Sequence, residues 1–304
     1  MTIYAYCHTT PQLPSAFDAK VHSVFNHAVN LSLQKTNHIT TILKATDILY
    51  PGCLCLKETT RTFRDIFHPG QLVSYNSGKM ILGETGERID TSNAKLIDCK
   101  LAHLTISPSQ YSLTIYEMLS ALMQKHITHR FKNDSKLQIQ LQIKLEYGLA
   151  CLITAVIEQD NALALNAIRQ LVALGMGLTP SGDDILVGFL AGLRTNQELI
   201  ADHETFLQKF TSDVLLLLNH TNVISQQYLL HAVNGYFSTA IIALLTAISS
   251  GKSITSIEEC AKKLLTIGHT SGVDILAGLF GALSILYKSH IISNKQFSIF
   301  NHWR

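Results

Sequence analysis

The residues best suited to chemistry lie together in residues 175–193, which read Gly-Met-Gly-Leu-Thr-Pro-Ser-Gly-Asp-Asp-Ile-Leu-Val-Gly-Phe-Leu-Ala-Gly-Leu. A glycine-rich turn there leads into two carboxylates, Asp183 and Asp184, and an almost wholly apolar run follows them. The first N–H groups of a helix lack intrahelical acceptors and lie at its positive end, so such a helix start is suited to hold an anion. With the hydroxyls of Thr179 and Ser181 beside it, the segment predicts a small-anion binding site.

The same arrangement occurs a second time near the end of the chain. Residues 268–278 read Gly-His-Thr-Ser-Gly-Val-Asp-Ile-Leu-Ala-Gly, which repeats the order Ser-Gly-x-Asp-Ile-Leu-x-Gly of residues 181–188. We expect the two helix starts to converge on one pocket, each offering N–H donors to an anionic group. A small ligand with two negative ends suits such a pocket. The second copy has Val273 where the first has Asp183, so the two halves are not equivalent.

A purely structural interpretation of both starts is a capping box. Ser181 is then the N-cap residue and accepts an N–H of the first turn, while Asp184, three residues later, reaches back. Ser271 and Asp274 have the same spacing. On this interpretation the later glycines of both helices are packing spacers and no ligand is needed.

Three features exceed what a cap needs. Gly182 and Gly272 are predicted at the first helical position, where glycine costs about 0.5–1 kcal/mol relative to alanine unless something approaches the backbone closely. Gly175 and Gly177 add two permissive positions before the first helix, which favours a concave nest of N–H groups. Asp183 has no part in the cap, and a surplus acid at an anion-binding turn suggests a bound cation, a proton relay or an amine-bearing ligand.

The composition excludes several classes of partner. The 304 residues are 47% hydrophobic and 15% charged, so the chain can bury a large core, with two domains the better expectation. The net charge is only +2, and no cluster of Lys and Arg alternates with aromatics, so we expect no nucleic acid partner. The six cysteines are scattered and their closest pair, Cys53 and Cys55, lacks metal-site spacing, so they are predicted to be buried reduced thiols.

No membrane partner is expected either. Polar residues and prolines interrupt the beginning of the chain, which therefore lacks a secretory hydrophobic region. The longest low-polarity run, residues 275–287, is too short to span a bilayer. We expect a soluble cytoplasmic protein.

Residues 175–193 and 268–278 follow a β-rich first third of the chain. Short β-type runs alternate there with turns such as Pro51-Gly52 and Pro69-Gly70, which predicts a small antiparallel barrel or sandwich. The predicted strands cover residues 21–25, 38–43, 52–56, 71–75, 79–82 and 95–100.

The rest of the chain has the apolar spacing of helices, starting from Ser107-Pro108-Ser109. The predicted helices cover residues 108–129, 135–158, 162–174, 182–195, 203–218, 225–233, 237–249, 256–266 and 272–289. The fold class is therefore α+β, with a β-rich domain over residues 1–105 and a larger α-helical domain over residues 106–304 that carries both Ser-Gly-x-Asp helix starts. No low-complexity linker separates them, so we expect close packing between the domains.

The two chemical segments resemble the AllH-type family, a domain of unknown function whose namesake is a subunit of oxamate carbamoyltransferase in allantoin breakdown. The match over residues 175–193 is close, and the match over residues 268–278 supports it. Weaker matches touch both predicted domains: residues 21–25, Ala28, Asn30, Leu31, Thr221, Ser225, His231, Ala232 and Gly235.

The resemblance implies a subunit of a multi-subunit enzyme that moves a carbamoyl group between phosphate and oxamate, with other subunits and a small anionic metabolite as partners. Implied candidates for proton transfer or carbonyl polarisation are Asp183, Asp184, Asp274 and His269. Candidates for anion binding are Gly175, Gly177, Thr179, Ser181, Gly182, Thr270, Ser271, Gly272, Thr221, Ser225 and His231. A divalent cation held by the carboxylates is compatible with this chemistry, and no organic cofactor is expected.

Other candidate motifs are weaker. Residues 59–62, Thr-Thr-Arg-Thr, resemble a phosphate loop of classical carbamoyltransferases, but that loop belongs before a helix and these residues lie in the β-rich part. His126 and His129 lack carboxylate or cysteine companions at ligand spacing, so surface or capping roles are favoured over a metal site. Two alternatives to an enzyme remain open: a non-catalytic protein that binds or scaffolds a small anion, and a purely structural role for both helix starts.

Overall fold

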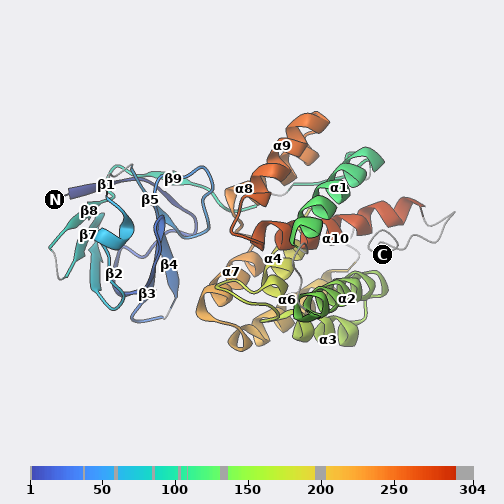
Figure 1. Ribbon diagram of the computed structural model, residues 1–304, viewed down its shortest axis with the longest axis horizontal. Helices are drawn as coiled ribbons and strands as arrows, with labels where there is room; N and C mark the ends of the chain where they lie inside the picture. The colour runs from blue at the N-terminus through green and yellow to red at the C-terminus, as the bar shows by residue number, and fades with distance from the viewer. Residues whose placement is uncertain are drawn as a thin grey trace. The chain divides into compact units, whose positions relative to one another are not determined.

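The computed structural model describes residues 2–36, 38–57, 61–83, 86–101, 104–107, 109–130, 136–195 and 203–291 (Figure 1). The chain forms two compact units. One comprises Met1–Ala102 with Thr221–Ile242, and the other comprises His103–His220 with Ala243–Arg304. We describe them as the barrel unit and the helical unit. The domain boundary predicted near residue 105 stays a prediction.

The barrel unit is built on one nine-stranded sheet that closes on itself. The order β5-β4-β3-β2-β6-β7-β8-β1 returns to β5 through a β1–β5 pairing, and β9 adds to the far side of β1. Its strands are β1 Thr2–Thr9, β2 Ala16–Val24, β3 Ala28–Leu33, β4 Ile39–Leu43, β5 Leu54–Leu56, β6 Leu72–Asn76, β7 Lys79–Leu82, β8 Arg88–Asp90 and β9 Lys95–Ile97. Closure removes the unpaired edges that an open sheet would expose.

The predicted α+β class and the predicted barrel are confirmed. Most neighbouring strands are antiparallel, as expected, but β4–β5, β1–β8 and β1–β9 are parallel pairs. β1 is absent from the predicted strands, although its side chains alternate between exposed and buried from Thr2 to Thr9. Ile3 and Ala5 point into the barrel core, while Tyr4 and Tyr6 are half exposed.

A second apolar cluster of the barrel unit contains cysteines. Cys7, Cys53 and Cys55 are buried with Leu43 and Leu49. Cys7 and Cys55 are opposite one another on β1 and β5. Burial, with a smaller contribution from the neighbouring thiols, raises the pKa of Cys7 to about 12, so this thiol stays protonated. All six cysteines are free, as predicted, but Cys151 and Cys260 are only partly buried and so differ from the predicted buried thiols.

The helical unit is built around two central helices, α4 and α10, which are apolar on almost every face. Every residue of α4 is buried, which is typical of a helix packed on all sides. The helices of the chain are α1 Leu113–Arg130, α2 Lys136–Glu158, α3 Asn161–Leu171, α4 Ser181–Leu193, α6 Glu204–Leu216, α7 Val223–Val233, α8 Thr239–Ser249, α9 Ile254–Leu265 and α10 Ser271–Ile291. Each predicted helix has a counterpart among them, but α7 belongs to the barrel unit, and α8 begins in that unit and ends in the helical unit.

Glycines allow α4 and α10 to touch backbone to backbone. A methyl group at Gly188 would lie 1.9 Å from the carbonyl oxygen of Ile275, and one at Gly278 would lie 2.0 Å from that of Ile185. The two contacts are reciprocal, because each glycine of one helix meets the corresponding isoleucine carbonyl of the other. Any side chain at either glycine would force the helices apart.

One helix outside this pair has the length of a membrane span. Among the residues described, α2 alone passes a test of length and apolar composition, and 33% of its apolar window is buried in the protein. Core helices of soluble proteins pass the same test. The low-polarity run at residues 275–287 forms part of α10.

Replacing Gly278 with alanine is expected to destabilise the helical unit far more than replacing Gly281 on the same helix. At 278 the new methyl meets a backbone oxygen, whereas at 281 it meets the flexible side-chain ends of Leu149 and Ile153. Overpacking costs roughly 1–3 kcal/mol, and alanine recovers about 0.5–1 kcal/mol of helix propensity. Urea unfolding followed by far-UV circular dichroism should therefore show a loss towards the upper end of the net range, about 2 kcal/mol, for Gly278→Ala and little change for Gly281→Ala. Equal losses would contradict the backbone contact as the limiting feature.

Candidate functional site

The starts of α4 and α10 lie side by side. The Thr179 Oγ1 and Ser271 Oγ atoms are 3.0 Å apart, a hydrogen bond in which either hydroxyl can donate. Both residues are partly exposed, whereas three acids that follow them a few residues later in the sequence are buried: Asp183, Asp184 and Asp274. The two helix starts therefore lie together, as predicted. The anion pocket predicted between them stays a prediction.

The capping differs from the predicted capping box. Pro180, not Ser181, is the N-cap residue of α4, and it has no side-chain acceptor. Its carbonyl oxygen accepts the N–H groups of Asp183 and Asp184, at 3.0 and 3.1 Å. At the start of α10 the carbonyl oxygen of Thr270 accepts the N–H groups three and four residues later in the same way. Both serines therefore stand one position inside their helices, and neither is the N-cap residue that the capping box requires.

The glycine after each serine is explained by the chain's own backbone. A methyl at Gly182 would lie 1.9 Å from the carbonyl oxygen of Leu171, at the end of α3, and one at Gly272 would lie 2.3 Å from that of Leu264 in α9. The Gly182 N–H donates to Leu174 O at 2.8 Å, and the Gly272 N–H donates to Ile267 O at 3.0 Å. The close approach predicted at these glycines is real, but these two N–H groups are already bonded within the protein. Both glycines are the second helical residue, not the first.

The turn before α4 exposes an apolar tip. Gly175 and Gly177 have φ angles of +125° and +102°, which only glycine adopts readily. A methyl at Gly175 would lie 2.7 Å from the backbone nitrogen of Ser181, whereas Gly177 faces open space. Between them the Met176 side chain is 87% exposed. The turn is thus fixed against the helix start at its first glycine and open to solvent at its second.

The buried acids have different surroundings. Asp183 Oδ1 accepts the backbone N–H of Ala173 at 2.9 Å. Ala173 has a φ of +61°, an uncommon conformation for alanine, so Asp183 stabilises the strained turn at the end of α3. This acid, which the sequence leaves without a structural explanation, therefore has a structural partner.

Asp184 has the environment of a proton-carrying group. Burial raises the pKa of its carboxyl to about 8, hydrogen bonds from the Ser271 and Thr179 hydroxyls oppose the shift, and the nearby Asp274 and Asp183 charges add to it. Its Oδ2 atom is buried and has no hydrogen-bond partner among the described residues. At neutral pH this carboxyl mostly keeps its proton. A group with a pKa close to the working pH is suited to give and take a proton.

Comparison with protein-family models identifies the chain. Residues 171–283 match the model described as oxamate carbamoyltransferase subunit AllH, and residues 5–96 match the AllH family N-terminal domain. The chain belongs to the AllH family. The name of the first model describes one subunit of an oxamate carbamoyltransferase. Comparison with solved structures gives no match.

His269 is a further predicted site residue, next to the start of α10. His269 is exposed and lies in the turn before α10, between Gly268, with a φ of +57°, and the partly exposed Thr270. The described residues contain no group of three or more His, Cys, Asp or Glu side chains arranged to hold a metal ion. A divalent cation at this site stays a prediction.

His231 of the AllH chain lies in the barrel unit, on α7. Its Nε2 atom is 2.9 Å from Gln227 Nε2, and the Gly52 backbone lies against its ring, where a methyl on that glycine would be 3.4 Å from Nε2. Burial, helped by the nearby His38, lowers the pKa of His231 to about 4. The ring is therefore neutral at physiological pH, which suits a hydrogen-bonding role better than binding an anion by charge.

Thr221 and Ser225 also belong to the barrel unit, at the start of α7. The N-cap of this helix is Asn222, whose side chain accepts the N–H groups of Ile224 and Ser225. Ser225 is fully buried, and its hydroxyl has no hydrogen-bond partner among the described residues. These residues belong to the barrel unit, whereas the starts of α4 and α10 belong to the helical unit.

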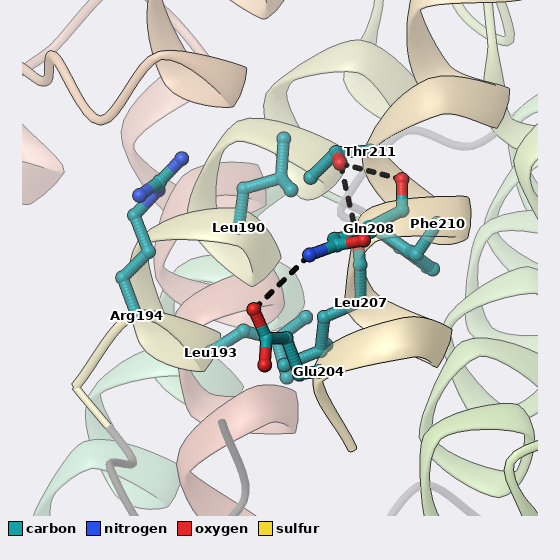
Figure 2. Close-up of a pocket in the computed structure, with 8 residues that line it drawn as sticks. All are labelled: Leu190, Leu193, Arg194, Glu204, Leu207, Gln208, Phe210 and Thr211. Carbon is teal, nitrogen blue, oxygen red and sulfur yellow. Dashed lines mark hydrogen bonds between the residues drawn. The ribbon is translucent and has the colours of Figure 1, made fainter. Parts of the chain in front are cut away.

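A cavity that the sequence does not predict lies at the other end of α4, against α6 (Figure 2). Its volume is 220 Å³. Its lining comprises Leu190, Leu193, Arg194, Glu204, Leu207, Gln208, Phe210 and Thr211. Glu204 and Gln208 hydrogen-bond to each other along α6, and Thr211 donates to backbone oxygens, so the polar lining is largely engaged with itself (Figure 2). Ordinary helix spacing of leucines gives no signal of such a cavity.

Two weaker predictions are not tested. Residues 59 and 60 of the disfavoured phosphate loop lie outside the described residues, as does the side chain of His129. His126 is exposed on α1, in keeping with a surface role.

The substitution Asp184→Asn is expected to remove a pH dependence of stability. The folded-state pKa of about 8 exceeds the ordinary value of 3.8, so the folded protein holds an extra proton between these two values. Stability from this group is complete below the lower value and falls as pH rises towards 8, by up to about 1.4 kcal/mol per pH unit. In urea unfolding from pH 5 to pH 8, the free energy of unfolding of the variant should therefore rise relative to that of the native protein as pH rises. Titrations that both proteins keep, such as that of His231, cancel in this difference. A difference that does not change with pH would contradict a buried protonated Asp184.

Proposed function

We propose that this AllH chain is the subunit of a carbamoyl-transferring enzyme that binds a small anionic substrate at the paired starts of α4 and α10. The observation that carries the proposal is Asp184, a buried carboxyl with a raised pKa behind two hydroxyls at the meeting point of two helix N-termini. The reaction implied by the family name converts oxalurate and phosphate into oxamate and carbamoyl phosphate, and the reverse. Each of these molecules is an anion.

Charge at the helix starts favours such ligands. Two helix N-termini lie together, and the positive end of each macrodipole stabilises a nearby anion by about 0.3–1 kcal/mol at an exposed site. A protonated Asp184 adds no negative charge to repel the ligand. The N–H groups of Gly182 and Gly272 are already bonded within the protein. We therefore expect the hydroxyls of Thr179 and Ser271 to contact the anion directly, with Ser181 and Thr270 beside them.

The raised pKa of Asp184 matches the proton transfer that the reaction needs. When phosphate attacks the carbamoyl carbon of oxalurate, the bond from that carbon to the oxamate nitrogen breaks, and the nitrogen must gain a proton. Asp184 can donate it from the carboxyl, and in the reverse direction can accept it from the attacking amide. In this proposal His269 donates to the carbamoyl oxygen, and Asp274 is the acid at the corresponding position in the second copy.

A competing function is a non-catalytic protein that binds a small anion at the same place. It rests on the same observations but requires no proton transfer and no partner subunit. Turnover separates the two functions, and ligand binding separates both from a purely structural role for the helix starts.

Binding should be detectable on this chain alone. We expect phosphate, oxamate, oxalurate or carbamoyl phosphate to raise the melting temperature, because a ligand at one hundred times its Kd stabilises a folded protein by about 2.7 kcal/mol. Ser271→Ala should weaken this effect at least about tenfold in ligand concentration, a loss of about 1.4 kcal/mol typical of one hydrogen bond to a charged group. Ser212→Ala, which removes an exposed hydroxyl from α6, is the matched control. No shift with any of the four anions would contradict a binding site at the helix starts.

Turnover is tested by phosphate-dependent breakdown of oxalurate, measured for this chain alone and together with candidate partner subunits. We expect Asp184→Asn to lower kcat by roughly a hundredfold or more, the usual contribution of general acid–base catalysis, while the variant still assembles and binds phosphate. Ser271→Ala should mainly raise KM. Full activity of Asp184→Asn would exclude a proton-transfer role, and binding without turnover in any complete assembly would favour the non-catalytic function.

A further inference from the structure

β2 of the barrel contains a bulge that presents a histidine and a serine together. Val21 is paired with Leu31 of β3, and Ser23 is paired with Asn30, so His22 is the extra residue between two successive pairs. The pairing of β2 with β6 ends at Lys20, just before the bulge. Bulges redirect side chains and are frequent beside functional sites.

The bulge begins a row of hydrogen-bonded side chains across three strands. Asn30 Nδ2 donates to Ser23 Oγ at 3.0 Å, and Thr41 Oγ1 donates to Asn30 Oδ1 at 2.8 Å. His22 Nδ1 lies 3.2 Å from the same Ser23 Oγ. Asn30 is only 6% exposed, so its amide is held in one orientation, whereas Ser23 is partly exposed and His22 is exposed.

The direction of the Ser23 hydroxyl proton depends on which nitrogen of His22 carries a proton. With a proton on His22 Nδ1, Ser23 Oγ accepts one hydrogen bond from Asn30 and one from His22, which uses both of its lone pairs. The hydroxyl proton then points away from both donors, towards solvent. A negatively charged oxygen placed there receives an oriented O–H donor beside an imidazole that carries positive charge in its protonated form.

We propose that Ser23 and His22 form a second oxyanion-binding site, on the barrel, for a carboxylate or phosphate group. The site lies in the barrel unit and needs none of the residues of the α4 and α10 starts. It therefore goes beyond the proposed function and does not depend on it. Thr41 and Asn30 are positioning residues that act through Ser23.

The test is an NMR titration of the full chain, labelled with ¹⁵N, with inorganic phosphate in one series and oxamate in another. We expect the His22 ring resonances to shift saturably, with Nδ1 in its protonated form in the complex. Ser23→Ala should weaken binding at least about tenfold with little change in melting temperature, and Thr41→Val should weaken it less, because Asn30 only loses its orientation. The two series distinguish a carboxylate ligand from a phosphate ligand.

His27→Gln is the matched control, since His27 is another exposed histidine, in the turn after β2, that has no part in the row. This variant should bind as the native protein does. Ser271→Ala should also leave the His22 shift intact, so a failure of the helix-start site does not imitate a failure here. The absence of a saturable His22 shift, or an equal shift in Ser23→Ala, would overturn the proposal.

Discussion

The backbone contact between α4 and α10 is the constraint on which the rest of the helical unit depends. Gly188 and Gly278 let each helix lie against a carbonyl oxygen of the other, and no larger residue fits at either position. Because the helices touch there, their first turns are held close enough for Thr179 and Ser271 to share a hydrogen bond. The same contact surrounds Asp184 with protein, and burial is the largest cause of its raised pKa. Packing of apolar helices thus sets the protonation state of a polar group at their ends.

The acids behind this contact divide their roles according to their partners. Asp183 accepts the N–H of a strained residue and so maintains the turn. Asp184 receives hydroxyl hydrogen bonds that oppose its raised pKa, but burial and two neighbouring acids outweigh them. Three carboxyl groups so near each other cannot all ionise cheaply in a desolvated place, and the pKa of Asp184 is raised accordingly.

Some of this organisation can be read from the sequence. The repeated Ser-Gly-x-Asp order predicts two helix starts, and their meeting follows because apolar helices with matching glycines pack together. The cap of α4 was predicted one residue late, since a proline can act as N-cap through its carbonyl oxygen alone, which no side-chain pattern reveals. The partner of Asp183 depends on the positive φ of Ala173, and sequence patterns rarely indicate that conformation for alanine. The sequence predicts α7 as one more helix of the second half, because the spacing of its apolar residues does not indicate which core the helix joins.

The reciprocal pairing of Gly188 with Ile275 and of Gly278 with Ile185 has a consequence for how the two helices can differ. Such a contact is isologous, the kind that two identical subunits make across a two-fold axis. Here one chain supplies both halves of the contact, so the two helix starts need not be identical. Val273, at the position that corresponds to Asp183, is such a difference. A symmetric dimer would carry that valine in both copies, whereas the single chain carries it once and keeps one acid to hold its turn.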